Sequence, residues 1–140
     1  MGTGIESGIE TVGLYGSIPV DGGGGNQTAP VFHGFERLSG SEDIGADGIA
    51  DVLLGSPPAD GWWLLERIVM KSTSVLDTVA VVYVGEVRDE DTQDIGAGNG
   101  AVAEYPRGLI VPGGRVLRVR WTGGTPGARV FVNAQATLWR

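Results

Sequence analysis

The chain has 140 residues, a formal net charge of −7 and no cysteine. This length fits one domain with a core of its own, and the lack of cysteine excludes disulfides and thiolate metal sites. Only ten basic residues stand against seventeen acidic ones, which argues against a nucleic-acid partner because phosphate binding needs clustered cations. No apolar run reaches the ~20 residues of a membrane-spanning helix, so we expect no membrane partner.

Residues 1–35 are predicted to form an extended, glycine-rich N-terminal arm. Glycine recurs throughout this segment and forms a run at Gly22–Gly25, which breaks regular structure and resembles a flexible joint. The arm is nevertheless richer in apolar residues than a disordered tail. We therefore expect it to dock, either on its own domain or on a neighbouring subunit. Its candidate contact residues are Val12, Leu14, Tyr15 and Phe32.

Residues 36–140 are predicted to form an all-β domain. Many glycine and proline turns between short apolar runs favour an antiparallel β-sandwich of jelly-roll-like type and leave no room for a long helix. The expected strands lie at about residues 49–54, 62–71, 78–84, 109–111, 115–121 and 129–139.

Three of these segments give more specific expectations. In the strand 62–71 the even positions, which include Trp62, Leu64, Ile68 and Met70, form the predicted core face. The strand 78–84 is apolar on both faces, which predicts cover on both sides. Residues 85–100 are polar and acidic, and we expect a long loop there.

The last predicted strand alternates with period two over ten residues, which is a strong strand signal. Phe131 and Trp139 fall on its polar face. An exposed aromatic pair is typical of a contact surface, although cover by the arm explains it as economically. The opposite, apolar face consists of Val130, Val132, Ala134, Ala136 and Leu138.

The search for chemistry predicts no enzyme, no cofactor and no metal site. His33 is the single histidine, and no nucleophile elbow accompanies it. The acidic stretch from Asp89 has Asp94 at its sixth position, where a calcium loop of the EF-hand type needs glycine. Carboxylate pairs of the kind that glycosidases use are present, but their spacing selects none, so a small hydrolase is only a minor alternative.

The charges are unevenly spread along the chain. From Glu104 to the end there are six arginines and one acidic residue, whereas the earlier part is strongly acidic. One explanation is a solvated strand face. The other is that acidic and basic faces of neighbouring copies meet in an assembly.

A resemblance covers about residues 60–138. Its segments are Trp62–Val69, Val82–Gly85, Leu109–Gly114, Val119–Gly123 and Pro126–Ala128. Their pattern of strands and turns resembles small structural proteins of tailed bacteriophages, especially those that infect actinobacteria. The resemblance implies a minor tail or head-decoration protein that forms a homo-oligomer, has other virion proteins as partners and is located in the virion after synthesis in the host cytoplasm. It carries over no functional residue.

A second function class is open at this point. Trp62, Trp63 and Trp139 are candidate stacking platforms for sugar rings, so a carbohydrate-binding β-sandwich module is the alternative interpretation.

Overall fold

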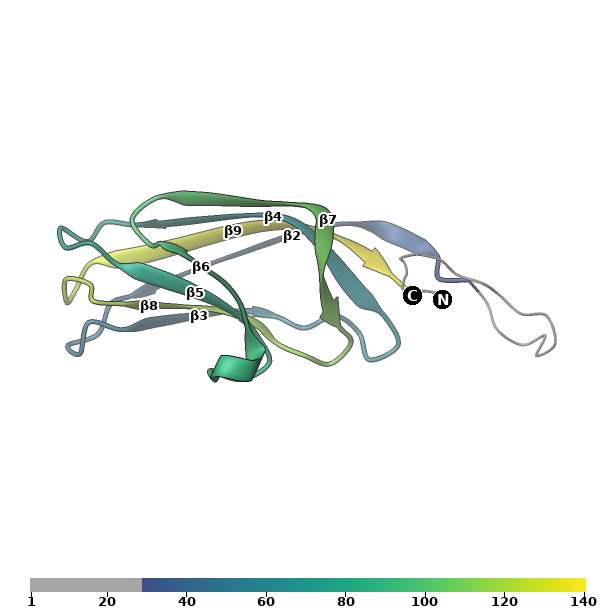
Figure 1. Ribbon diagram of the computed structural model, residues 1–140, viewed down its shortest axis with the longest axis horizontal. Helices are drawn as coiled ribbons and strands as arrows, with labels where there is room; N and C mark the ends of the chain where they lie inside the picture. Colours follow the sequence, from purple (N-terminus) through teal and green to yellow (C-terminus); the bar gives the residue numbers. More distant parts are fainter. Residues whose placement is uncertain (1–28) are drawn as a thin grey trace. The chain divides into compact units, whose positions relative to one another are not determined.

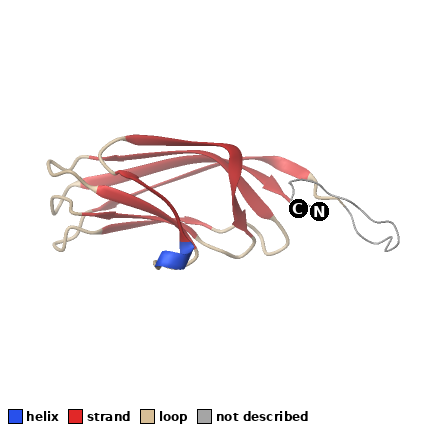
Figure 2. Ribbon diagram, in the orientation of Figure 1, coloured by secondary structure: helices blue, strands red, loops and turns tan. Residues whose placement is uncertain are grey.

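The computed structural model describes residues 29–140, and these form an all-β fold with one short 3-10 turn, as predicted (Figures 1 and 2). The first described strand begins at Phe32, four residues before the domain start expected from the sequence. The elements are β2 (Phe32–Asp43), β3 (Ala50–Gly55), β4 (Trp62–Ser72), β5 (Val79–Val84), η1 (Asp89–Asp91), β6 (Thr92–Ala97), β7 (Ala101–Pro112), β8 (Leu117–Thr122) and β9 (Arg129–Trp139).

The described strands form two facing antiparallel sheets. The first sheet has the order β2-β9-β4-β7, and the second sheet has the order β3-β8-β5-β6. The pairs β2/β9, β3/β8, β4/β7 and β5/β6 are all antiparallel, so the chain is one long hairpin wound through both sheets (Figure 1). Pairing of β9 with β4 and of β8 with β5 completes the sheets. This winding is a jelly roll, which confirms the predicted sandwich.

The core lies between the two sheets and is built by alternate residues of each strand. In β9 the predicted apolar face is buried from Val130 to Ala136. From the second sheet, Trp121 is fully buried and its Nε1 donates a hydrogen bond of 2.9 Å to the carbonyl of Gly98. Each buried aliphatic side chain contributes about 1.5–3 kcal/mol by leaving water. The largest fully buried side chains are Trp121, Leu65, Ile68, Met70, Leu117, Val82, Val111, Val119 and Val130.

The predicted core face of β4 is half wrong, because the strand contains a β-bulge. Glu66 is an extra residue between Leu65 and Arg67, which pair with consecutive residues of β9. A bulge shifts the alternation of side chains by one position. The core residues are therefore Trp63 and Leu65 before the bulge, and Ile68 and Met70 after it.

The expected loop at residues 85–100 is also wrong, since it contains the short turn η1 and the strand β6. Among the described strands, β6 is an edge strand that pairs only with β5. Such a strand needs no apolar run, and its sequence TQDIGA gives a weak strand signal. Ile95 of β6 is exposed. In β5, Val79 is exposed on the outer face, so the described residues cover only the inner face of that strand fully.

Candidate functional site

An aromatic cluster lies on the outer face of the first sheet, where β2 begins and β9 ends. Phe32 packs edge-on against both Phe35 and Trp139, with ring centroids 5.2 and 5.6 Å apart. Phe32 and Trp139 are register partners on neighbouring strands. The Trp139 Nε1 donates a 2.8 Å hydrogen bond to the hydroxyl of Thr137. Phe35 is 80% exposed, so this cluster presents an aromatic surface to solvent.

A β-bulge at Gly34 makes this cluster possible. Phe32 and Phe35 are three positions apart, which in a regular strand puts them on opposite faces. Phe32 pairs with Trp139 and Phe35 with Thr137, so β2 has one more residue here than β9. Gly34 has a φ of +113°, a conformation that glycine supplies readily in bulges. The bulge therefore turns both phenylalanines to the outer face.

Beside this cluster the same outer face is hollowed. The hollow has a volume of about 580 Å³. It is built in rows across β2, β9 and β4, in which Gln135 lies between Arg37 and Arg67, and Phe131 lies between Ser41 and Lys71. We call it the basic hollow, and its lining consists of Arg37, Ser39, Gly40, Ser41, Arg67, Val69, Lys71, Phe131, Val132, Asn133 and Gln135.

The cations of the basic hollow have no ion-pair partner among residues 29–140. No carboxylate oxygen of this part of the chain lies within 4 Å of the charged nitrogens of Arg37, Arg67 or Lys71, whereas five other arginines are paired. Glu104 of β7 is a register partner of Arg67, but the two form no ion pair. The bulge at Glu66 is the reason that Arg67 and Lys71 point to the outer face. Three cations without an ion pair in the described part of the chain therefore share one sheet face, and Glu66 and Glu104 lie in the hollow next to it.

On the outer face of the second sheet, one arginine is paired across neighbouring strands. Arg120 of β8 binds Asp51 of β3 with two hydrogen bonds, of 2.7 and 2.9 Å. Such a bidentate pair is neutral and fixed in geometry. The same face also presents the exposed aliphatic side chains of Leu53, Val79 and Ile95 to solvent.

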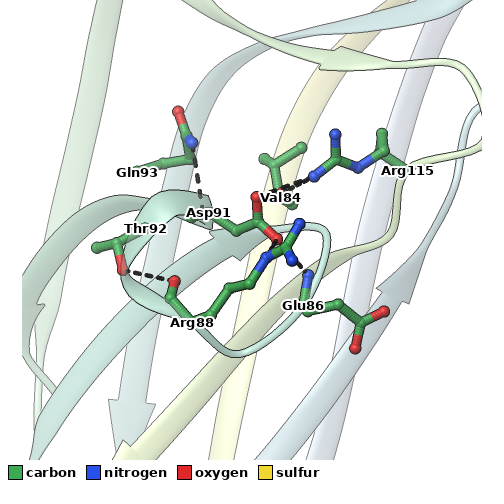
Figure 3. A network of polar contacts seen from close by, with 7 residues as sticks. All are labelled: Val84, Glu86, Arg88, Asp91, Thr92, Gln93 and Arg115. Atoms are coloured by element: carbon green, nitrogen blue, oxygen red, sulfur yellow. Dashed lines mark hydrogen bonds and ion pairs between the residues drawn. The ribbon is translucent and has the colours of Figure 1, made fainter.

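A polar network closes the end of the second sheet near η1 (Figure 3). One oxygen of Asp91 accepts 2.8 Å hydrogen bonds from the backbone N–H of Glu86 and from Arg88. The other accepts a 3.0 Å bond from Arg115, which also donates to the carbonyl of Val84. The network links the β5–β6 connection to the residues before β8.

These contacts explain the titration of Asp91 and identify its role. The backbone N–H of Glu86 and the Arg88 guanidinium hold the pKa of Asp91 below its ordinary value of 3.8. A carboxylate that is fully hydrogen-bonded and ion-paired stays charged and is a poor general acid or base. Tyr105 differs, since burial, followed by its hydrogen bond to Asp94, raises its pKa. Both groups are structural.

The β4–β5 loop is a further feature, which neighbouring turns hold in place. The amide of Asn99, in the β6–β7 turn, donates to the carbonyls of Ser74 and Leu76. The hydroxyl of Thr125, in the β8–β9 loop, accepts from the backbone N–H groups of Val75 and Leu76. Val75 and Leu76 are nevertheless exposed, Val75 by 86%. Apolar side chains that a fixed loop holds in solvent are typical of contact sites.

The residues predicted as contacts fall in two groups. Phe32 and Trp139 are in the aromatic cluster, and Phe131 lines the basic hollow. Their role as contacts remains a prediction. Sequence reasoning did not single out Phe35, whose direction depends on a bulge, or the cations of the basic hollow, which only the strand order brings together. The remaining predicted contacts lie outside the described residues; they are Val12, Leu14 and Tyr15.

The candidate residues for other chemistry are dispersed. Trp63, one of three candidate sugar platforms, is only 4% exposed, so its ring is part of the core and cannot stack on a sugar. His33 is exposed on β2. In residues 29–140, no three His, Cys, Asp or Glu side chains are grouped as a metal ion requires. Over the same residues, no helix is long and apolar enough to cross a membrane.

No known protein family and no curated protein matches the chain. Among solved structures it is similar to a chain of the extra small virus particle of the giant freshwater prawn Macrobrachium rosenbergii, with 19% identity over 88% of this chain and 86% of that one and a TM-score of 0.36. It is also similar to VP2 in the subviral particle of infectious bursal disease virus, with 16% identity, 87% and 37% coverage and a TM-score of 0.37. At such low values, the fold assignment rests on the strand order alone.

Proposed function

We propose that this protein is a non-enzymatic structural component of a virion, which assembles with further copies of itself and with other virion proteins. One observation carries the proposal. Large apolar side chains are exposed on both outer sheet faces and on the fixed β4–β5 loop, as Phe35, Ile95 and Val75 illustrate. Exposed apolar surface of this kind marks regions that are buried in a complex.

The fold is compatible with this role without deciding it. Jelly rolls occur in viral capsid proteins, lectins and cupins, and a fold by itself implies no function. The surface favours a structural subunit over a monomeric binding module. Its exposed aliphatic side chains at Leu53, Ile95 and Val75 provide contact area that a monomeric module does not need.

The finer form of the proposal is a minor tail or capsid-decoration protein of a tailed phage, attached through its N-terminal arm and one sheet face. The resemblance of residues 60–138 supports this form, and the apolar residues in the arm support the arm as an attachment element. Immunogold electron microscopy of particles made by the genome that encodes the chain tests it. Label on tails or on capsids is the expected result, and particles without label contradict the proposal.

A loop variant tests the assembly surface. We expect V75D/L76D to abolish self-association and to leave the fold intact, because both side chains already lie in solvent. The matched control is S56D/A59D, which adds the same charge to exposed positions of the β3–β4 loop. Light scattering after size-exclusion chromatography measures the mass of each variant. Equal masses for both would show that the β4–β5 loop is not a contact.

Deletion of residues 1–28 tests the arm. All described strands begin at Phe32 or later, so we expect a folded β domain that no longer assembles. Circular dichroism checks the fold and light scattering the mass. An assembly of wild-type size would refute the arm as the attachment element.

A further inference from the structure

We propose that the basic hollow of the first sheet is a binding site for an acidic polysaccharide, one that carries carboxylate or sulfate groups on its sugar rings. The site goes beyond the assembly proposal. Its central residues are cations of β2 and β4, whereas the assembly proposal rests on exposed apolar side chains. Three features of the hollow carry the inference: its available cations, its neutral polar groups and its position on a sheet face.

The cations specify a negatively charged ligand. Arg37 lies on β2, while Arg67 and Lys71 lie on β4, so they flank the central strand β9 from both sides. Elsewhere on the same sheet, Asp43 neutralises Arg129 through a 2.7 Å ion pair. The cations of the hollow have no such partner within the described residues. Charged donors that face solvent across a hollow bind sulfate or carboxylate oxygens by charge-assisted hydrogen bonds.

The neutral groups of the hollow specify a ligand rich in hydroxyls. Asn133 and Gln135 of β9 and Ser39 of β2 provide side chains that both donate and accept hydrogen bonds, as sugar hydroxyls do. Phe131 is exposed in the same hollow and offers an apolar ring face. The adjoining hollow toward the aromatic cluster includes Glu36 and Glu66, whose carboxylates would repel an acidic chain, so the proposed ligand is confined to the basic hollow.

The alternatives fit the hollow less well. A nucleic acid carries one charge per ~1.7 Å of duplex and requires more cations than this acidic chain provides. An extended acidic peptide binds best as an added strand at a sheet edge. The hollow lies instead on the face formed by β2, β9 and β4. The backbones of β9 and β4 pair with a strand on each side, so a ligand over this face contacts side chains.

The experiment measures binding of dextran sulfate to the full-length protein by isothermal titration calorimetry. Neutral dextran, polyglutamate and an oligothymidylate are the comparison probes. We expect dextran sulfate to bind and the other three to bind at least tenfold more weakly. Neutral dextran that binds equally well would show that the cations do not select the ligand. Equal binding of polyglutamate or oligothymidylate would overturn the polysaccharide class.

Single substitutions place the binding in the hollow. We expect R37Q and R67Q each to weaken dextran sulfate binding by about tenfold, as the loss of a hydrogen bond to a charged group does. The matched control is R140Q, which removes the same charge at an exposed C-terminal residue that pairs with Asp60. Equal affinity of R67Q and R140Q would overturn the site. Since assembly is measured by mass and binding by heat, either proposal can fail without the other.

Discussion

Two sets of arginines on the outer sheet faces are in opposite states. On the second sheet, Arg120 is neutralised by Asp51 through two hydrogen bonds. On the first sheet, Arg37 and Arg67 lie across Gln135 without a carboxylate partner in the described part of the chain. A paired arginine joins strands, whereas an unpaired one leaves its donors to a ligand. The difference separates residues that maintain the fold from residues that are available for binding.

The largest effect on stability that we expect comes from a substitution in the core between the two sheets. W63A should lower the free energy of unfolding by about 3–5 kcal/mol, since it removes a buried aromatic ring. Its neighbour Trp62 faces outward and is only partly buried, so W62A should cost about 1 kcal/mol. Urea unfolding measures both. A larger loss in W62A than in W63A would contradict the assignment of Trp63 to the core.

A smaller loss should follow from G85A, which tests the network beside the second sheet. Gly85 has a φ of +118°, and a methyl group there would collide with the Arg115 guanidinium and the Asp91 carboxylate. The strained backbone alone costs about 1–3 kcal/mol. The control is G34A, which has a similar φ of +113° but no atom within 4 Å of the added carbon. We expect a lower urea midpoint for G85A; equal midpoints would show that the network does not restrict this position.

D91N should lower the thermal midpoint by a few degrees at pH 7. The pKa of Asp91 is lower in the folded chain than its ordinary value of 3.8. Its contribution to stability is therefore complete above that value and is lost as the pH falls through the folded pKa. The difference in thermal midpoint between wild type and D91N should become smaller below about pH 4. Calorimetric scans from neutral to strongly acidic pH measure it, and a gap that widens on acidification would contradict the account.

The smallest effect should come from the basic hollow. R37Q and R67Q should change the free energy of unfolding by no more than about 0.5 kcal/mol, because neither residue has an ion-pair partner to lose among residues 29–140. Urea unfolding compares the destabilisation of R37Q and R67Q with that of D51N, a variant that removes the ion-pair partner of Arg120. If R67Q were the more destabilised, the outer cations of the first sheet would be structural as well.

Much of the fold could be predicted from the sequence. The alternation in β9 and the turns that bound β4 and β8 follow from short-range pattern, which period two makes visible. The edge strand β6 was missed because a strand that pairs on one side needs little apolar content. The core face of β4 was predicted correctly at Ile68 and Met70 but wrongly at Trp62 and Leu64, because the extra residue Glu66 interrupts the alternation between them.

The basic hollow could not be predicted for the same physical reason. Arg37, Arg67 and Gln135 are far apart in the chain and meet only through the strand order β2-β9-β4. Two bulges, at Gly34 and at Glu66, then decide which side chains share the outer face. A charged residue in a strand shows in the sequence, but its neighbours across the sheet do not.

The central claim is that the exposed apolar surface of this jelly roll is an assembly surface. Light scattering of the full-length protein and of V75D/L76D, over a wide range of concentration, tests it most directly. The account predicts that the full-length protein has a mass several times that of one chain and that the variant has the mass of a monomer. A full-length protein that is a strict monomer at the highest concentration would contradict it.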